Sequence, residues 1–221
     1  MSKAISVVKA AELIPDGASL LVGGFMGVGS PHRLLAELVR QGRKKLTVIA
    51  NDTARPGIGI GVLIDAKAVQ KLIVTHIGTN PETQRQMIAG EIEVELVPQG
   101  TLAERIRAGG FGLGGVLTPT GVGTTVADGK RTIDIDGKSF LLELPVKADF
   151  ALLAAYRADY EGNLDYAMTA RNFNPIMAMA GATVIAEPNE IVPVGVIPPD
   201  AVVTPHVLVD HIIEKGLSNG R

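Results

Sequence analysis

Short aliphatic runs alternate with helical stretches between residue 19 and about residue 108, and this alternation constrains the fold more than any other feature. The runs at residues 19–22, 46–50, 71–75 and 93–97 are rich in Val, Ile and Leu and have the length of strands. Strands that alternate with helices are typical of βαβ units, in which the strands lie parallel. The sequence therefore predicts an α/β fold with an open, mostly parallel sheet and helices on both faces.

The helical stretches carry start signals. Ser30 and Pro31 predict a helix with Ser30 as its N-cap and Pro31 at its first position. Asn80 and Pro81 repeat this arrangement for a second helix. Residues 101–104 (Thr-Leu-Ala-Glu) have the pattern of a capping box and predict the start of a third helix.

The second half of the chain is less regular. Residues 109–129 hold eight glycines in 21 positions with almost no charge, and we expect a buried or interface-lining loop there. Asp136-Gly137 predicts a tight β-hairpin as an elaboration of the sheet. Further elements are expected as strands at 148–154 and 182–186, a short helix near 174–180 and a terminal helix around 207–214. No repeat or boundary divides the sequence, so residues 1–221 are expected to form a single domain.

The composition excludes several kinds of function. The chain has 21 Lys plus Arg against 23 Asp plus Glu, so no basic field favours nucleic acid as a partner. Because it has no Cys, it can form no disulfide, zinc-thiolate site or cysteine nucleophile. Its apolar stretches are too short for a membrane span or a signal peptide. We expect a soluble, cytoplasmic protein with an aliphatic core and no membrane partner.

The densest functional signal is the glycine-rich segment at residues 23–31, which lies between a predicted strand and a predicted helix. The carboxyl end of a strand that faces a helix N-terminus favours anionic ligands, and glycine allows the backbone to approach them closely. The segment fits neither the G-x-G-x-x-G dinucleotide fingerprint nor a P-loop. Residues 110–115 do fit G-x-G-x-x-G, but they follow a helix. A tight turn that merely requires small residues is the other interpretation of residues 23–31.

Polar residues follow three of the predicted strands, and parallel strands bring such residues to one edge of the sheet. Asn51 and Asp52 end the second strand, His76 ends the third and Gln99 ends the fourth. The uncharged amide of Gln99, in a Pro-Gln-Gly turn, suits a donor to a developing oxyanion. Each residue could equally be a loop cap. The chain has no G-x-S-x-G elbow, no H-E-x-x-H and no cluster at metal spacing, so no nucleophile or metal is evident.

Residues 16–31, Asp-Gly-Ala-Ser-Leu-Leu-Val-Gly-Gly-Phe-Met-Gly-Val-Gly-Ser-Pro, resemble the signature of the family I coenzyme A transferases. The resemblance extends over nearly the whole chain, through residues 49–53, 76–83, 97–102, 105–110 and 170–175. Within the family it is strongest to the acetate–acetoacetate type, with the butyrate–acetoacetate type near it. The 3-oxoadipate and 3-oxoacid types resemble this chain less around residues 51–83.

The resemblance implies a protein that moves CoA from an acyl-CoA to a free carboxylic acid through a glutamyl-CoA thioester. It implies an alpha subunit whose beta partner carries the nucleophilic glutamate in a Ser-Glu-Asn-Gly stretch, in α2β2 or α4β4 assemblies. This chain lacks that stretch, and we interpret Glu161, which precedes Gly162 and Asn163, as a structural turn residue. CoA would be a substrate, and no cofactor or metal would be held permanently.

The resemblance also assigns roles to residues of this chain. It implies CoA contact at Gly24, Phe25, Met26, Gly27, Val28, Gly29 and Ser30. It makes Gln99 the candidate oxyanion donor that faces the glutamate of the partner subunit, and Asn51 a candidate for the substrate site. A small apolar acyl pocket lined by Phe25, Met26 and residues 109–115 would suit acetate or acetoacetate.

Two other classes of function remain open from the residues alone. A sugar-phosphate sensor or isomerase-like module shares this general fold, but it would be expected to bring a charged cluster or a Lys and Asp pair to the glycine segment. A nicotinamide dehydrogenase could use Asp52 as a ribose ligand, but it would need a fingerprint that the sequence lacks.

Overall fold

The computed structural model describes residues 3–214. Its helices are α1 (Val7–Glu12), α2 (His32–Arg40), α3 (Gly61–Asp65), α4 (Pro81–Ile88), α5 (Gln99–Gly110) and α6 (Asn174–Ala180). Its strands are β1 (Ala4–Ile5), β2 (Ser19–Val22), β3 (Leu46–Ala50), β4 (Val69–Val74), β5 (Glu93–Leu96), β6 (Val116–Thr118), β7 (Thr132–Ile135), β8 (Lys138–Glu143), β9 (Ala148–Asp159), β10 (Leu164–Asp165), β11 (Gly181–Val192) and β12 (His211–Ile213).

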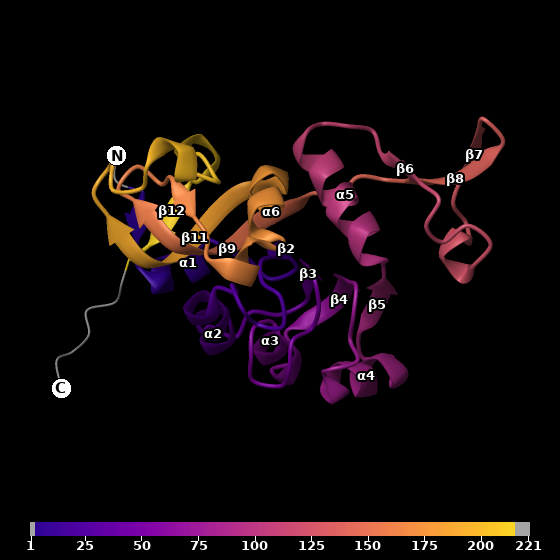
Figure 1. The fold of residues 1–221 in the computed structure, drawn as a ribbon. Coiled ribbons are helices and arrows are strands. Elements are labelled where there is room, and N and C mark those ends of the chain that lie inside the picture. The colour runs from indigo at the N-terminus through magenta and orange to yellow at the C-terminus, as the bar shows by residue number, and fades with distance from the viewer. Residues whose placement is uncertain (1–2, 215–221) are drawn as a thin grey trace.

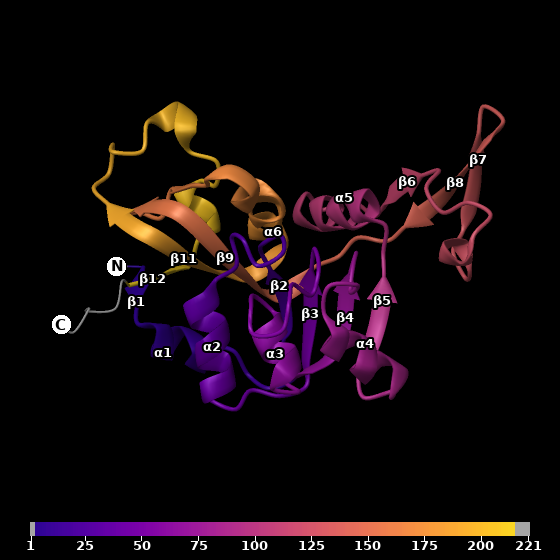
Figure 2. The ribbon, with the colours of Figure 1, turned by 60° about the horizontal axis from the view of Figure 1, so that its bottom comes forward.

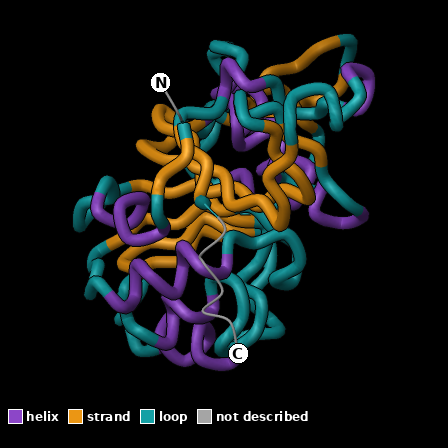
Figure 3. The backbone as a smooth tube through the Cα atoms, turned by 90° about the vertical axis from the view of Figure 1, so that its left-hand side faces the viewer, coloured by secondary structure: helices purple, strands orange, loops and turns teal. Residues whose placement is uncertain are grey.

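The main sheet confirms the predicted α/β architecture. Its strand order is β1-β12-β11-β9-β2-β3-β4-β5, and each of these neighbouring pairs is parallel (Figure 1). The short strand β10 pairs antiparallel with β9. Helices α1 to α4 lie on one face of the sheet, and α5 and α6 lie on the other (Figure 2). Figure 3 shows the strands as a layer with helices on either side.

Both faces of the sheet are buried, which explains the continuous aliphatic strands. Leu20 and Val22 of β2 pack in one hydrophobic cluster, with the helices of the first face. Leu21, which points the opposite way, packs in a second cluster with Leu102 of α5 and Met177 of α6. A strand that is buried on both sides has no polar alternation, because neither of its faces meets water.

A small antiparallel sheet projects away from the main sheet beyond α5 (Figures 1 and 2). Its strand order is β6-β8-β7. The predicted hairpin is confirmed between β7 and β8, where Asp136 (φ 51°) and Gly137 (φ 73°) form the turn. Residues 109–129 do not form a buried loop in this chain taken alone, and the other alternative, that they line an interface, stays a prediction. Two of their apolar side chains, Phe111 and Leu113, are more than half exposed.

Two predicted caps differ from the structure. Helix α2 begins at His32 with Pro31 at its N-cap position, and the Ser30 hydroxyl donates to the Gly23 carbonyl oxygen at 3.0 Å instead. Helix α5 begins at Gln99 after Pro98, so the expected capping box at residues 101–104 lies inside the helix. The Asn80 cap is confirmed, since its side chain accepts from the Thr83 backbone N–H at 3.2 Å.

The expected terminal helix at 207–214 is also wrong. A short 3-10 turn at His206–Leu208 is followed by strand β12, which pairs with β11 and with β1. The local pattern is overridden because β12 completes the sheet between these two strands, where Ile212 and Ile213 are buried. Within residues 3–214 no helix combines the length and the apolar character that crossing a membrane would require.

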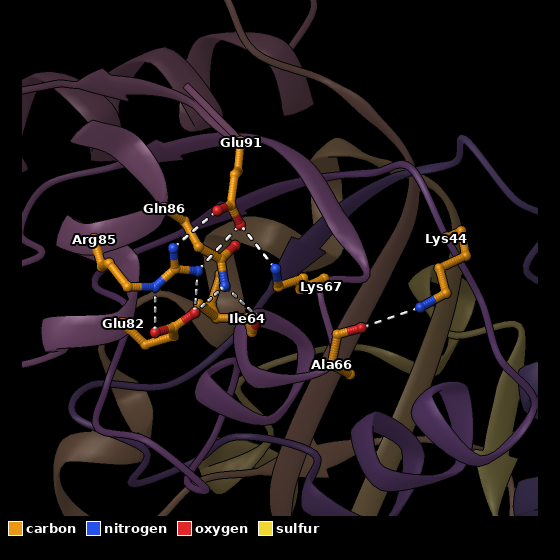
Figure 4. Close-up of polar contacts among 8 residues, drawn as sticks. All are labelled: Lys44, Ile64, Ala66, Lys67, Glu82, Arg85, Gln86 and Glu91. Atoms are coloured by element: carbon orange, nitrogen blue, oxygen red, sulfur yellow. Dashed lines mark hydrogen bonds and ion pairs between the residues drawn. The ribbon is translucent and has the colours of Figure 1, made fainter. Parts of the chain in front are cut away.

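A network of charged side chains joins the two ends of α4 (Figure 4). The Arg85 guanidinium donates to both carboxylate oxygens of Glu82 at 2.9 and 2.7 Å and to those of Glu91 at 2.8 and 3.1 Å. Lys67 pairs with Glu91 at 3.1 Å, and Gln86 donates to Glu82 at 2.8 Å. The hydrogen bonds from Arg85, assisted by Gln86 at Glu82 and by Lys67 at Glu91, lower the pKa of each carboxyl to about 2.

We expect the substitution Arg85→Ala to raise the pKa of both Glu82 and Glu91 toward 4.5. Because their folded-state pKa values lie below the unfolded value, the network stabilises the fold above pH 4.5 and loses this effect as the pH falls toward 2. A carbon-detected NMR titration of the glutamate carboxyls measures the change. Arg107→Ala, which removes a similar surface pair with Glu104, should leave both values unchanged. Titration near 2 in the Arg85 variant would contradict the assignment.

Candidate functional site

The glycine loop, residues 23–30, leaves the carboxyl end of β2 and folds into a tight hairpin. The backbone groups of Phe25 and Val28 exchange two hydrogen bonds of 2.9 Å, so Met26 and Gly27 form its two-residue turn. Both turn residues have positive φ, 51° for Met26 and 85° for Gly27. These are the signs expected for a type I′ turn, in which a non-glycine residue such as Met26 is strained.

Close packing explains why two of the loop residues are glycine. A Cβ atom on Gly27 would lie 2.3 Å from the Cγ2 atom of Ile58. A Cβ atom on Gly29 would lie 2.7 Å from the backbone Cα of Ala170, and the φ of Gly29 is 77°. The loop is therefore packed between the segments that carry Ile58 and Ala170, and these contacts restrict its movement.

The Asp52 carboxylate anchors the strained turn to the end of β3. One of its oxygens, Oδ2, accepts from the Met26 backbone N–H at 2.9 Å and from the Asn51 side-chain amide at 2.6 Å. The other oxygen, Oδ1, accepts from the Ala54 backbone N–H at 2.7 Å. Three N–H groups thus satisfy a carboxylate that is 6% exposed, as a buried charge requires.

A cavity of about 340 Å³, here the central cavity, opens where the glycine loop meets the carboxyl ends of β3 and β4 and the start of α5. It unites the residues that the sequence predicted at this edge with one further residue, Thr75. Its lining residues are Phe25, Met26, Asn51, Asp52, Thr75, His76 and Gln99. Residues 109–115, expected to line an acyl pocket, are not among them.

Hydrogen bonds fix the two amide side chains of the central cavity. The Gln99 Nε2 atom donates to Asn51 Oδ1 at 2.5 Å, and Asn51 Nδ2 donates to Asp52. Because Asp52 Oδ2 accepts from the NH2 group of Asn51, the oxygen of Asn51 points toward Gln99. The Gln99 NH2 group consequently donates one of its two hydrogens to Asn51 Oδ1, and its second hydrogen remains available for a ligand.

The Gln99 side chain is therefore held more firmly than the side chain of a residue in an isolated turn. It is the first residue of α5 and is exposed to solvent on one side, and its amide is tethered through Asn51. An exposed polar side chain that is already oriented loses little conformational entropy when it binds a ligand.

An outer cavity of about 410 Å³ adjoins the central cavity and shares Phe25 and Gln99 with it. Its other lining residues are Thr169, Arg171 and Asn172. Sequence analysis did not single out these three residues as part of a site, although they fall within or beside the segment 170–175 that carries the family resemblance. A third cavity of about 470 Å³ includes Val28, Gly29 and Ser30 in its lining.

The N-terminus of α2 is already occupied, contrary to the anion site that the sequence suggested there. The carboxylate of Glu187 in β11 accepts from the backbone N–H groups of Arg33 at 3.1 Å and Leu34 at 2.9 Å. A ligand phosphate cannot take these groups without displacing Glu187. No signal in the local sequence could identify this cap, because Glu187 is more than 150 residues away along the chain.

The seven residues predicted to contact CoA differ in what they can offer. Phe25 and Val28 are 40% and 53% exposed, and Met26 and Gly29 are half-buried. Gly24, Gly27 and Ser30 are buried, and the hydroxyl of Ser30 is used within the loop. The buried members shape the loop, and the exposed members form the surface that a ligand can touch.

Glu161 lies in the turn between β9 and β10, where Asp159 Oδ1 accepts from the backbone N–H groups of Glu161, Gly162 and Asn163. Burial opposes the charge of Asp159, but hydrogen bonds from Asn163, Gly162 and Glu161 outweigh it and lower its pKa. Glu161 itself is exposed and lines neither the central nor the outer cavity. Within residues 3–214 no group of three or more His, Asp or Glu side chains could hold a metal ion.

The sequence of residues 4–215 matches the Coenzyme A transferase family. The chain belongs to the coenzyme A transferase family. It is 54% identical over 212 residues to the acetate CoA-transferase subunit alpha of Escherichia coli K12, a match that covers 96% of each chain. It is 47% identical over 214 residues to the acetoacetyl-CoA:acetate/butyrate CoA transferase alpha subunit of Clostridium acetobutylicum, covering 97% of this chain and 98% of that subunit.

Solved structures support the fold of this CoA-transferase chain. It superposes with a TM-score of 0.84 on glutaconate coenzyme A-transferase from Acidaminococcus fermentans, at 21% identity over 96% of this chain and 75% of that one. It superposes with a TM-score of 0.83 on the acyl-CoA transferase YdiF from Escherichia coli O157:H7, at 22% identity over 97% of this chain. This CoA-transferase chain spans 47% of the YdiF chain.

Proposed function

We propose that this chain is the alpha subunit of a short-chain acyl-CoA transferase of the acetate type. The enzyme moves CoA from acetyl-CoA to acetoacetate or to another short-chain carboxylic acid. The observation that carries the proposal is the oriented amide of Gln99 beside the glycine loop, in a cavity whose one carboxylate, Asp52, already accepts three hydrogen bonds from this chain. The high identity to alpha subunits with these substrates in their names supports it.

The beta subunit supplies the nucleophilic glutamate in this scheme. Its carboxylate attacks the carbonyl carbon of the acyl-CoA, and the pair of electrons of the C=O bond moves onto the oxygen. A carboxylate is a weak nucleophile toward a thioester, so the reaction needs a donor that is already aimed at this oxyanion. The second N–H of Gln99 Nε2 is such a donor, and Asn51 and Asp52 fix its direction.

The CoA moiety lies against the exposed part of the glycine loop in this proposal, at Phe25, Met26, Val28 and Gly29. Gly24, Gly27 and Ser30 then act by holding the loop in shape. Binding of the CoA nucleotide, remote from the reacting carbonyl, contributes energy that can be expressed in the transition state. CoA is a substrate here, and we propose no permanently bound cofactor.

The chain forms one domain of the alpha type, and it pairs with its beta subunit as α2β2 or α4β4 in the cytoplasm. The exposed apolar side chains near the small antiparallel sheet, among them Phe111, Leu117 and Leu144, are consistent with a surface that a partner covers.

Dehydrogenase chemistry is not favoured, because Asp52 is buried and already accepts three hydrogen bonds, so a ribose hydroxyl has poor access to it. A sugar-phosphate module is not favoured either, since both cavities together offer a single Arg and no Lys.

Transfer of CoA from acetyl-CoA to acetoacetate tests the proposed function directly. The tagged chain should be assayed alone and in the complex that it captures from its own host. We expect activity in the complex only, together with loss of activity on borohydride reduction of one glutamate in the partner subunit. Activity in the isolated chain, or a lack of transfer between any short-chain acids in the complex, would contradict the proposal.

The substitution Gln99→Ala should lower kcat by about 10²- to 10³-fold, because the tetrahedral intermediate loses an oriented donor. Assembly with the beta subunit should be unchanged, as measured by size-exclusion chromatography. Thr75→Ser serves as a matched control in the same cavity, since it keeps the hydroxyl that donates to the backbone carbonyl oxygen of Asn51. If Gln99→Ala releases the beta subunit and leaves kcat of the residual complex intact, Gln99 is an interface residue.

A further inference from the structure

The central cavity holds a negative charge that the oxyanion chemistry does not use. Asp52 lines the cavity, and it accepts hydrogen bonds from three neutral N–H groups. No ion pair of Asp52 with a Lys, Arg or His side chain is found in the part of the chain that the structure describes. Its charge is therefore solvated by N–H dipoles and is not cancelled by a counter-charge.

The other charged groups around the cavity are exposed or lie outside its lining. His76, at the end of β4, is the only other titratable side chain in the lining, and it is exposed. Arg171 lines the outer cavity and does not line the central one. Arg55 follows Asp52 by three residues but is exposed and lines neither cavity.

We propose that the Asp52 charge is a specificity determinant that selects acids with an uncharged acyl tail and rejects dicarboxylic acids. This inference rests on the proposed function, in which the acyl group lies in the central cavity beside Gln99. Asp52 is linked to Gln99 through a single intervening side chain, by hydrogen bonds of 2.5 and 2.6 Å. A second carboxylate on the acyl tail would thus enter the cavity close to a fixed like charge.

The size of the central cavity in this chain does not distinguish these acids. A cavity of about 340 Å³ has room for a four-carbon monocarboxylic acid and for the dicarboxylic acid of the same length. Charge can provide this selectivity, because two like charges about 7 Å apart at an effective dielectric constant near 20 repel enough to weaken binding roughly tenfold to hundredfold. Neutralising Asp52 should relieve the reacting carboxylate of both acids to the same extent, and should in addition remove the repulsion on the second carboxylate, which only the dicarboxylic acid carries.

The test compares butyrate and succinate as CoA acceptors, with acetyl-CoA as donor, in the complex with the beta subunit. The readout is the ratio of kcat/KM for succinate to that for butyrate. We expect Asp52→Asn to raise this ratio at least tenfold, mainly through KM for succinate. A general loss of activity, from the altered hydrogen bonds to Met26 and Asn51, lowers both values together and cancels in the ratio.

Glu161→Gln is the matched control, since it removes an equal charge from an exposed turn that lines neither cavity. It should leave the ratio unchanged. If Asp52→Asn does not assemble, the wild-type complex decides the question with monomethyl succinate, which lacks the second charge and keeps the four-carbon chain of the diacid. We expect kcat/KM for monomethyl succinate to be at least tenfold higher than kcat/KM for succinate.

An unchanged ratio in Asp52→Asn, or equal use of succinate and its monomethyl ester, would overturn this inference while the proposed function stands. A wild-type complex that transfers CoA to neither butyrate nor acetoacetate would overturn the proposed function, and the inference with it. A succinate-to-butyrate ratio that rises as much in Glu161→Gln as in Asp52→Asn would show a general effect of net charge and would also overturn this inference.

Discussion

The hydrogen bond from the Met26 backbone to the Asp52 carboxylate is the contact on which the architecture of the site depends. Met26 has a positive φ of 51° that a methionine does not adopt freely. The bond of 2.9 Å to Asp52 holds it there, and the same carboxylate orients Asn51 and, through it, Gln99. One side chain thus links the shape of the loop proposed to bind CoA with the direction of the amide proposed to stabilise the oxyanion.

The parallel sheet explains why these groups meet. β2, β3 and β4 lie side by side and end at the same edge, so the segments that follow them are neighbours although they are far apart in sequence. Helix α5 then presents its first residue, Gln99, at that edge. The described residues thereby bring a donor and a binding loop together at an edge whose carboxylate, Asp52, is already occupied by three N–H groups, and a second chain that brings a glutamate to this edge would complete the chemistry.

Much of the fold could be predicted from the sequence because strands and caps are local signals. The alternation of aliphatic runs with capped helices predicted the parallel sheet, and the strand ends correctly predicted that Asn51, Asp52, His76 and Gln99 lie in one place. The sequence could not reveal contacts between distant segments. Glu187 caps α2 from β11, so the prediction of an N-cap at Ser30 from the local pattern was wrong. Strand β12 forms because it pairs with both β1 and β11, so the prediction of a helix at residues 207–214 was also wrong.

The most direct test of this account is a crystal structure of the alpha–beta complex with the thioester acetyl-CoA bound and the nucleophilic glutamate of the beta subunit replaced by alanine. The decisive measurement is the distance from Gln99 Nε2 to the carbonyl oxygen of that thioester. The account predicts a hydrogen bond of about 2.7–3.1 Å, with the second N–H of the amide aimed at the oxygen. A thioester oxygen that is bound by other groups, with Gln99 turned away from it, would contradict the role of Gln99 and of the network that orients it.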